Sequence, residues 1–220
     1  MKKNRLEAFS DGVFAIVITL LILEVKLPEV KYDDLSATLL HILPSIGAYG
    51  LSFILIGMYW MFHHYSFTLI RDVDGILLWL NIIFLLFVSF LPFPTMLMGR
   101  YPFQTLPMVI YGINLILANL NGFILLLYLK KNQQLASNIF TDKLYRSQVK
   151  MYMSINALYA LCVLLALAWP LISLILFACI TIFLIIRSAI FMGIGKCVTV
   201  PHTSGKHHEV NQHRDINTNE

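Results

Sequence analysis

Six long apolar blocks, separated by short polar segments, dominate the chain. They cover about residues 9–27, 41–62, 76–98, 106–129, 151–168 and 171–195. Each block is long enough to cross roughly 30 Å of hydrocarbon as a helix that rises 1.5 Å per residue. The pattern therefore predicts an all-α membrane protein with six transmembrane helices in residues 1–195. Residues 196–220 are polar and rich in histidine, which predicts a disordered tail.

Two features refine this outline. Pro92 and Pro94 lie near the end of the third block, where the missing amide donors of proline predict a broken or kinked helix. Between the fourth and fifth blocks, residues 130–150 contain five lysines and arginines. We interpret that segment as a basic polar loop.

The composition supports lipid as the solvent for the apolar blocks. Hydrophobic residues make up 58% of the chain and charged residues only 13%, whereas soluble domains carry roughly 25% charged residues. The three cysteines, Cys162, Cys179 and Cys197, are far apart in the sequence. That spacing argues against a disulfide framework and against a zinc site.

The positive charges predict the orientation in the membrane. Thirteen of the 16 lysines and arginines lie in the N-terminus, the second–third and fourth–fifth connections and the C-terminal region, and only Lys26, Lys31 and Arg100 lie on the other side. Because cytoplasmic segments carry the excess of lysine and arginine, both termini are expected in the cytoplasm. The net charge of +4 then reflects topology, and no nucleic-acid partner is expected.

The start of the first block carries ionisable groups beside a membrane helix. Arg5 precedes the sequence Phe9-Ser10-Asp11-Gly12. An ionised group at this position is costly unless it is paired or hydrated. Ordinary capping at the start of a helix explains Ser10 or Asp11 equally well.

Arg5 and Phe9-Ser10-Asp11-Gly12, followed by the apolar residues 13–21, resemble the first-helix motif of the transmembrane protein 175 potassium channel family, in its bacterial branch. The resemblance covers about residues 5–195 and is strongest in the first three blocks. Its further segments are Trp60-Met61-Phe62-His63-His64, Trp79-Leu80-Asn81 and Leu91-Pro92-Phe93-Pro94.

The resemblance implies a homotetramer in which the first helix of each subunit lines a central pore without a carbonyl filter. It implies a hydrophobic constriction at Ile16, Leu20 and Leu23, with selectivity set at Ile16 and Thr19. Positions 16, 20 and 23 form one stripe of a helix, although an all-apolar helix has such a stripe on every face. The resemblance also implies a structural polar network, whose members would be Arg5, Phe9, Ser10, Asp11, Trp60, one of His63 and His64, and Asn81.

The expected function is passive, potassium-preferring conduction in a bacterial cell membrane. The expected partners are potassium ions, the lipid bilayer and further copies of the chain, with no cofactor. The alternative is a secondary transporter whose broken third helix, at Pro92 and Pro94, forms a binding site, but the sequence has no evident internal repeat or central carboxylate. An enzyme or metal site at His63 and His64 is disfavoured, since adjacent helical residues point about 100° apart.

Overall fold

The computed structural model describes residues 2–26 and 35–196, and within these ranges the regular structure is helical. Residues 1–186 form one compact unit, and residues 187–220 form a second. The described part of the second unit contains the last turns of the final helix. Most of the segment expected to be a disordered tail, residues 197–220, lies outside the described residues.

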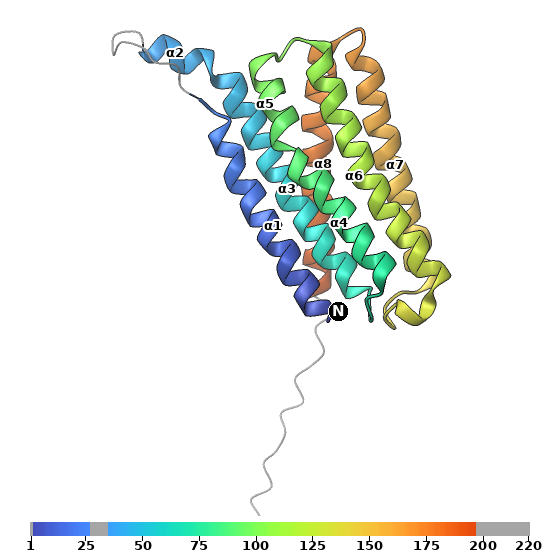
Figure 1. Ribbon diagram of the computed structural model, residues 1–220. Coiled ribbons are helices and arrows are strands. Elements are labelled where there is room, and N and C mark those ends of the chain that lie inside the picture. Colours follow the sequence, from blue (N-terminus) through green and yellow to red (C-terminus); the bar gives the residue numbers. More distant parts are fainter. Residues whose placement is uncertain (1, 27–34, 197–220) are drawn as a thin grey trace, which may run out of the picture. The chain divides into compact units, whose positions relative to one another are not determined.

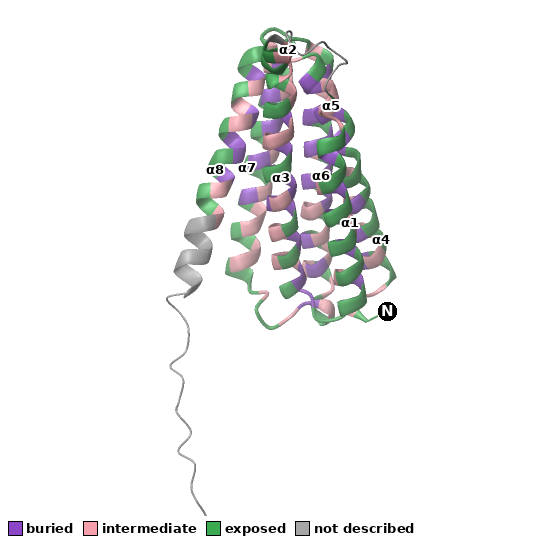
Figure 2. Ribbon diagram, turned by 90° about the vertical axis from the view of Figure 1, so that its left-hand side faces the viewer, coloured by how far each residue is buried: buried purple, intermediate pink, exposed green. Residues whose placement is uncertain are grey.

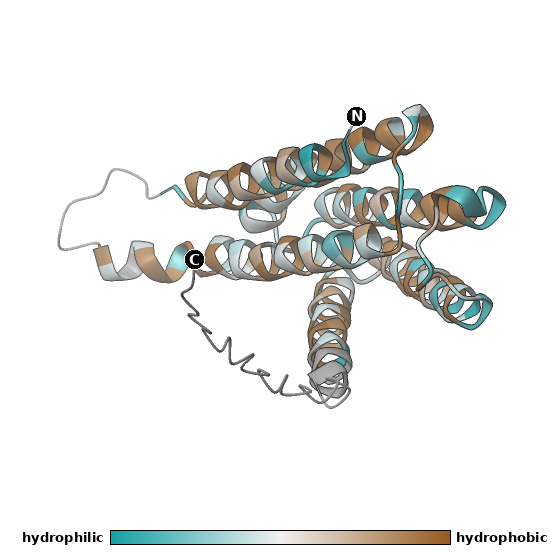
Figure 3. Cartoon of the chain, turned by 90° about the horizontal axis from the view of Figure 1, so that it is seen from below, coloured by the Kyte–Doolittle hydropathy of each residue, from teal (hydrophilic) through white to brown (hydrophobic). Residues whose placement is uncertain are grey.

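Among the residues that the structure describes, six helical segments are long and apolar enough to cross a membrane. This confirms the predicted all-α fold with six transmembrane helices (Figure 1). Apolar residues run along these helices, while hydrophilic residues gather near several helix ends (Figure 3). A short helix, α2 (Leu35–His41), precedes α3, and a single 3-10 turn, η2 (Gln133–Leu135), follows α6. The spans are α1 (Lys3–Leu23), α3 (Leu43–Thr68), α4 with α5 (Gly75–Phe90 and Pro92–Arg100), α6 (Thr105–Lys131), α7 (Asp142–Ala166) and α8 (Pro170–Lys196).

The third span is broken at the prolines. Helix α4 ends at Phe90 and α5 begins at Pro92, with Leu91 between them. Pro92 has no amide proton to donate within a helix, so the regular hydrogen-bond ladder stops there. The Leu91 amide instead bonds to the Val88 carbonyl in a tighter turn, over 3.1 Å.

The helix that contains the fifth span begins earlier than expected, and this corrects the interpretation of residues 142–150 as part of a loop. Helix α7 starts at Asp142, where the Thr141 hydroxyl caps it by accepting a hydrogen bond from the Leu144 amide over 3.3 Å. Asp142 lies in the first turn, where a negative charge interacts favourably with the helix dipole. All five basic residues therefore stand on helices, because Lys130 and Lys131 lie in the last turn of α6.

Close packing joins α6 to its neighbours α7 and α8. Gly112 on α6 is buried, and a Cβ atom added there would lie 2.4 Å from Val163 Cγ2 and 3.0 Å from Phe177 Cζ. A larger residue would thus force the three helices apart. Tyr111 on α6 and Tyr159 on α7 both contact the ring of Phe177, at centroid distances of 5.4 and 6.3 Å.

At the end of the bundle where α1 begins, the α3–α4 and α6–α7 connections meet (Figure 1). Ile70 and Ala136 form an isolated β-bridge. The Ser137 amide donates to the Leu69 carbonyl over 2.9 Å. A hydrophobic cluster lies beneath these loops. Its buried members come from the α3–α4 connection and from α1, α3, α4 and α6: Leu6, Phe67, Leu69, Ile70, Leu77 and Leu129.

Candidate functional site

Helix α1 has one face inside the bundle and one face outside it. It packs against α3, α4 and α5, and its buried residues are Leu6, Ser10, Phe14, Val17 and Leu21. The remaining residues leave a broad exposed face along the length of the helix (Figure 2). The outer face is mainly apolar, whereas the inner face includes the buried polar residue Ser10.

The outer face presents the predicted constriction residues as one stripe. Ile16 is 60% exposed, Leu20 43% and Leu23 63%. By contrast, Val17, one residue after Ile16, is 2% exposed and faces the core. An exposed row of large apolar side chains on a membrane helix must contact lipid, a narrow pore or another subunit.

Thr19 places the only hydroxyl on this stripe. Its Oγ1 atom donates to the Ile16 carbonyl over 2.8 Å. This bond fixes the side chain against its own helix and uses the hydroxyl proton. The oxygen lone pairs are then left on the exposed side, where they can accept a hydrogen bond or contact a cation.

The inner face of α1 is tied to α3 and α4 by a chain of three buried polar residues. His63 Nε2 lies 2.7 Å from Asn81 Oδ1, and Asn81 Nδ2 donates to Ser10 Oγ over 3.0 Å. Ser10 Oγ donates in turn to the Leu6 carbonyl over 2.9 Å. Since Asn81 Oδ1 is an acceptor, His63 carries its proton on Nε2 in this arrangement.

Aromatic rings enclose the imidazole of His63. Phe84 is stacked on it at a centroid distance of 5.6 Å with an interplanar angle of 11°, and Phe67 lies at 4.5 Å. Phe14 of α1 meets it edge-on at 5.6 Å. These phenylalanines, which the motif segments did not single out, keep the polar chain in an apolar pocket. Their only signal in the sequence is their helical spacing from Ser10, His63 and Asn81.

A second, separate contact joins α1 to α3 on the more exposed side. Trp60 Nε1 donates to Asp11 Oδ1 over 2.8 Å. The indole ring stacks on His64 at a centroid distance of 6.1 Å and an angle of 25°. The two histidines therefore sit in different clusters, His63 with Asn81 and His64 with Trp60.

Arg5 and Phe9 stand apart from both clusters. The Arg5 side chain is exposed, and no ion pair joins it to an acidic residue in the described ranges. Phe9 is 57% exposed. Seven residues before Ile16, it lies on the same outer stripe. The structure thus brings Ser10, Asp11, Trp60, His63, His64 and Asn81 into two clusters and leaves these two residues outside them.

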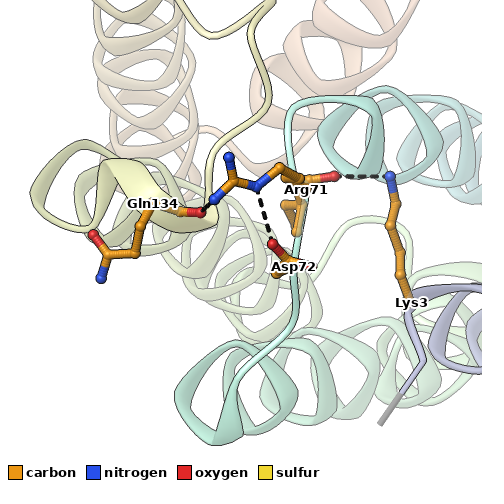
Figure 4. Close-up of polar contacts among 5 residues, drawn as sticks. Lys3, Arg71, Asp72 and Gln134 are labelled. Atoms are coloured by element: carbon orange, nitrogen blue, oxygen red, sulfur yellow. Dashed lines mark hydrogen bonds and ion pairs between the residues drawn. The ribbon is translucent and has the colours of Figure 1, made fainter.

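Lys3 adds an anchor for α1 that the motif did not reveal. Its Nζ atom donates to the Ile70 carbonyl in the α3–α4 connection over 2.8 Å (Figure 4). Arg71 next to it bonds to Asp72 and to the Gln134 carbonyl, so the connection is held to the α6–α7 connection as well. The first turn of α1 is thereby fixed to the α3–α4 connection, which is itself bonded to the α6–α7 connection.

The described residues contain no group of three or more histidine, cysteine, aspartate or glutamate side chains placed to hold a metal ion. His63 and His64 point into different clusters, because adjacent residues on a helix point about 100° apart.

Comparisons of the sequence and of the fold with known proteins indicate a family. The family model described as "Endosomal/lysosomal potassium channel TMEM175" matches residues 5–92, the segment that contains every residue of both polar clusters. Residues 5–92 belong to the TMEM175 family. A crystal structure of a TMEM175 homologue from Chamaesiphon minutus matches 84% of this chain and 97% of that one, with a TM-score of 0.75 and 29% sequence identity.

Relatives within the TMEM175 family come from bacteria and vertebrates. A potassium channel of Chryseobacterium sp. (strain P1-3) is 45% identical over 118 residues, which are 54% of this chain and 60% of the relative. The endosomal/lysosomal proton channel TMEM175 of Gallus gallus is 36% identical over 110 residues, which are 46% of this chain and 22% of the relative. The chain spans about half the length of the bacterial channels that it matches, and much less of the vertebrate one.

Proposed function

We propose that this chain is a subunit of a potassium-preferring cation channel, in which four copies surround a central pore lined by α1. One observation carries the proposal. The outer face of α1 is an exposed apolar stripe with a single hydroxyl, at Ile16, Thr19, Leu20 and Leu23, while the opposite face is held rigidly to the bundle. A helix that is anchored on one side and unpartnered on the other suits the lining of a shared pore.

The relatives support the same proposal. Three bacterial relatives are named potassium channels. The Chamaesiphon minutus protein, which matches over 97% of its length, is described as a homologue of a lysosomal potassium-selective channel. The vertebrate relatives are named proton channels, but they share a much smaller part of their length with this chain.

The proposed mechanism of selectivity is dehydration at a narrow apolar ring. Four Ile16 side chains offer no ligand that could replace the water around an ion, so ions pass hydrated or partly dehydrated, or the ring dewets and closes. Potassium loses water at lower cost than sodium, and this difference favours it. Thr19, one turn further along α1, would compensate in part, because its oxygen lone pairs remain available.

The two polar clusters would hold the pore helix in register. In a bilayer, buried polar groups must find partners within the protein. The Ser10–Asn81–His63 chain satisfies this requirement inside the subunit. The Trp60–Asp11 contact lies beside the outer stripe, where we expect it to shape the contact between subunits.

The proposed location is a bacterial inner membrane, with both termini in the cytoplasm. The excess of lysine and arginine on the side of the N-terminus supports this orientation. The channel is proposed to act without enzymatic chemistry or a cofactor. Its partners would be potassium ions, the bilayer and three further copies of the chain.

Recording from purified protein in a planar bilayer tests the proposed function. A channel shows unitary current steps with a reversal potential that follows the potassium gradient. A transporter, the alternative suggested by the broken third span, turns over too slowly to give unitary steps. Smooth, step-free flux from protein that is folded and inserted would contradict the channel.

A further inference from the structure

The first turns of α7 carry three exposed cations on one face. Lys143, Arg146 and Lys150 are spaced at i, i+3 and i+7, and Ser147 lies between them on the same side of the helix. We call these four residues the basic face. All four are exposed, and they line a shallow hollow in the surface together with Asp142.

The nearby negative charge is already neutralised. The Asp142 carboxylate bonds to Lys130 of α6, and the Lys130 ammonium also lies 5.5 Å from the centre of the Tyr145 ring. Within residues 2–26 and 35–196, no ion pair involves Lys143, Arg146 or Lys150. The basic face therefore presents three cations to its surroundings.

The same stripe of α7 becomes apolar as the helix continues. Leu161 and Leu164 follow the basic face at helical spacing, and both are exposed. The opposite side of α7, with Ile155 and Tyr159, is buried against the bundle. One continuous surface thus changes from cationic to hydrocarbon along its length.

The change falls where a membrane surface would lie. The part of α7 beyond Lys150, residues 151–166, rises roughly 24 Å, which is most of the roughly 30 Å of a bilayer core. Lys150 therefore stands at the edge of the hydrocarbon and Lys143 in the headgroup layer. Helix α7 packs on α6, whereas α1 packs on α3, α4 and α5, so the stripe lies away from the pore helix.

We propose that this stripe binds an anionic phospholipid of the leaflet on the side of the N-terminus. The phosphate would lie on the basic face, where Arg146 can offer two parallel hydrogen bonds and Ser147 a hydroxyl. An acyl chain would lie along Leu161 and Leu164. A cluster of cations at the end of a membrane helix, followed by apolar surface, matches the two parts of such a lipid. The site does not depend on which helix lines the pore.

Native mass spectrometry of the delipidated full-length protein tests the site. The probes are phosphatidylglycerol, phosphatidylcholine and inorganic phosphate, each added alone. The wild type should retain phosphatidylglycerol in preference to phosphatidylcholine. Each cation removed should lower that preference roughly fivefold, since a basic residue near a membrane surface contributes about 1 kcal/mol. The test variant is Lys143→Gln/Arg146→Gln/Lys150→Gln.

A charge-matched control is Lys2→Gln/Lys26→Gln/Arg100→Gln, which removes three exposed cations elsewhere. It should keep the preference. If both triple variants lose the preference for phosphatidylglycerol equally, the attraction is a general electrostatic one and the proposed site is contradicted. If inorganic phosphate is retained as strongly as phosphatidylglycerol, the site binds small anions, and the proposal that its ligand is a lipid is contradicted. If the triple variant does not fold, Arg146→Gln should still lose the preference roughly fivefold, whereas Arg146→Lys should keep most of it. An unchanged preference in folded Arg146→Gln would also contradict the proposal.

Discussion

The indole of Trp60 on α3 reaches the Asp11 carboxylate on α1 across 2.8 Å, at the edge of the exposed stripe of α1. Trp60 is itself 42% exposed. The bond joins two transmembrane helices at a position that lies at the surface of the single subunit. In the proposed tetramer this position borders the neighbouring copy, so the contact has consequences for both stability and assembly.

Weakening this bond is expected to reduce assembly. Trp60→Phe removes the donor and Asp11→Ala removes the acceptor of this bond. A hydrogen bond to a charged group is worth roughly 1.5–3 kcal/mol, and the partial exposure of this bond places it at the lower end. Size-exclusion chromatography in detergent should show more small species for each variant. A double-mutant cycle should show coupling between the two changes. Additive effects would mean that the contact does not contribute.

Ser10→Ala should destabilise the subunit itself. Ser10 is fully buried, and its loss leaves the Asn81 amide without an acceptor, at a cost of roughly 1–3 kcal/mol. Thermal unfolding in detergent measures the change. Ser89→Ala is the matched control, because the Ser89 hydroxyl is exposed and bonds only to its own helix. Equal melting temperatures of the two variants would argue against the Ser10–Asn81–His63 chain as an anchor of α1.

The topology can be tested with the loop that the structure describes. Asn138→Cys places an exposed thiol in the α6–α7 connection, whereas Ser137 is bonded to the Thr68 carbonyl and is less suitable. In a background without the native cysteines, Asn138→Cys should resist impermeant thiol reagents applied to intact cells. Gln104→Cys, at the opposite end of the bundle, should react. The reverse pattern would invert the proposed orientation.

Asp74 should give α4 a pH-dependent cap. Burial raises the pKa of Asp74, but hydrogen bonds from the Leu77 amide and the Tyr128 hydroxyl outweigh it and lower the pKa below its ordinary value of 3.8. The ionised cap therefore stabilises the fold fully above pH 3.8, and the stabilisation is lost as the pH falls through the lowered value. Asp74→Ala should cost about 1 kcal/mol at neutral pH and less in acid. Asp72→Ala, at an exposed ion pair, should change little at either pH, as measured by thermal unfolding.

Much of the architecture could be predicted from the sequence, because hydrophobic length is a strong constraint in a membrane. The six spans and the break at Pro92 follow from apolar runs and from the chemistry of proline. The predicted start of the fifth helix was wrong. A basic segment that is polar by composition can still be helical, and here it forms the first turns of α7 after the Thr141 cap. Hydropathy shows where a chain enters lipid, but it does not show where its helix begins.

The site was less predictable at the level of contacts. The structure places six of the motif residues in two clusters. Sequence could not decide between His63 and His64, because neighbouring positions differ only by about 100° of rotation. Packing decides it, since His63 faces Phe14, Phe67 and Phe84. The Lys3 contact with a loop carbonyl leaves no pattern in the sequence at all.

The pore assignment is tested most directly by potassium and sodium currents of Ile16→Asn in planar bilayers. We predict larger unitary currents and a weaker preference for potassium, because a polar ring stays wet. Thr19→Ala should weaken the preference with a smaller change in current. Ile22→Asn is the matched control, since Ile22 is 48% exposed but lies about 120° around the helix from Ile16. If assembled Ile16→Asn channels conduct and select like the parent, or if Ile22→Asn has the same effect, the narrow ring is not at Ile16.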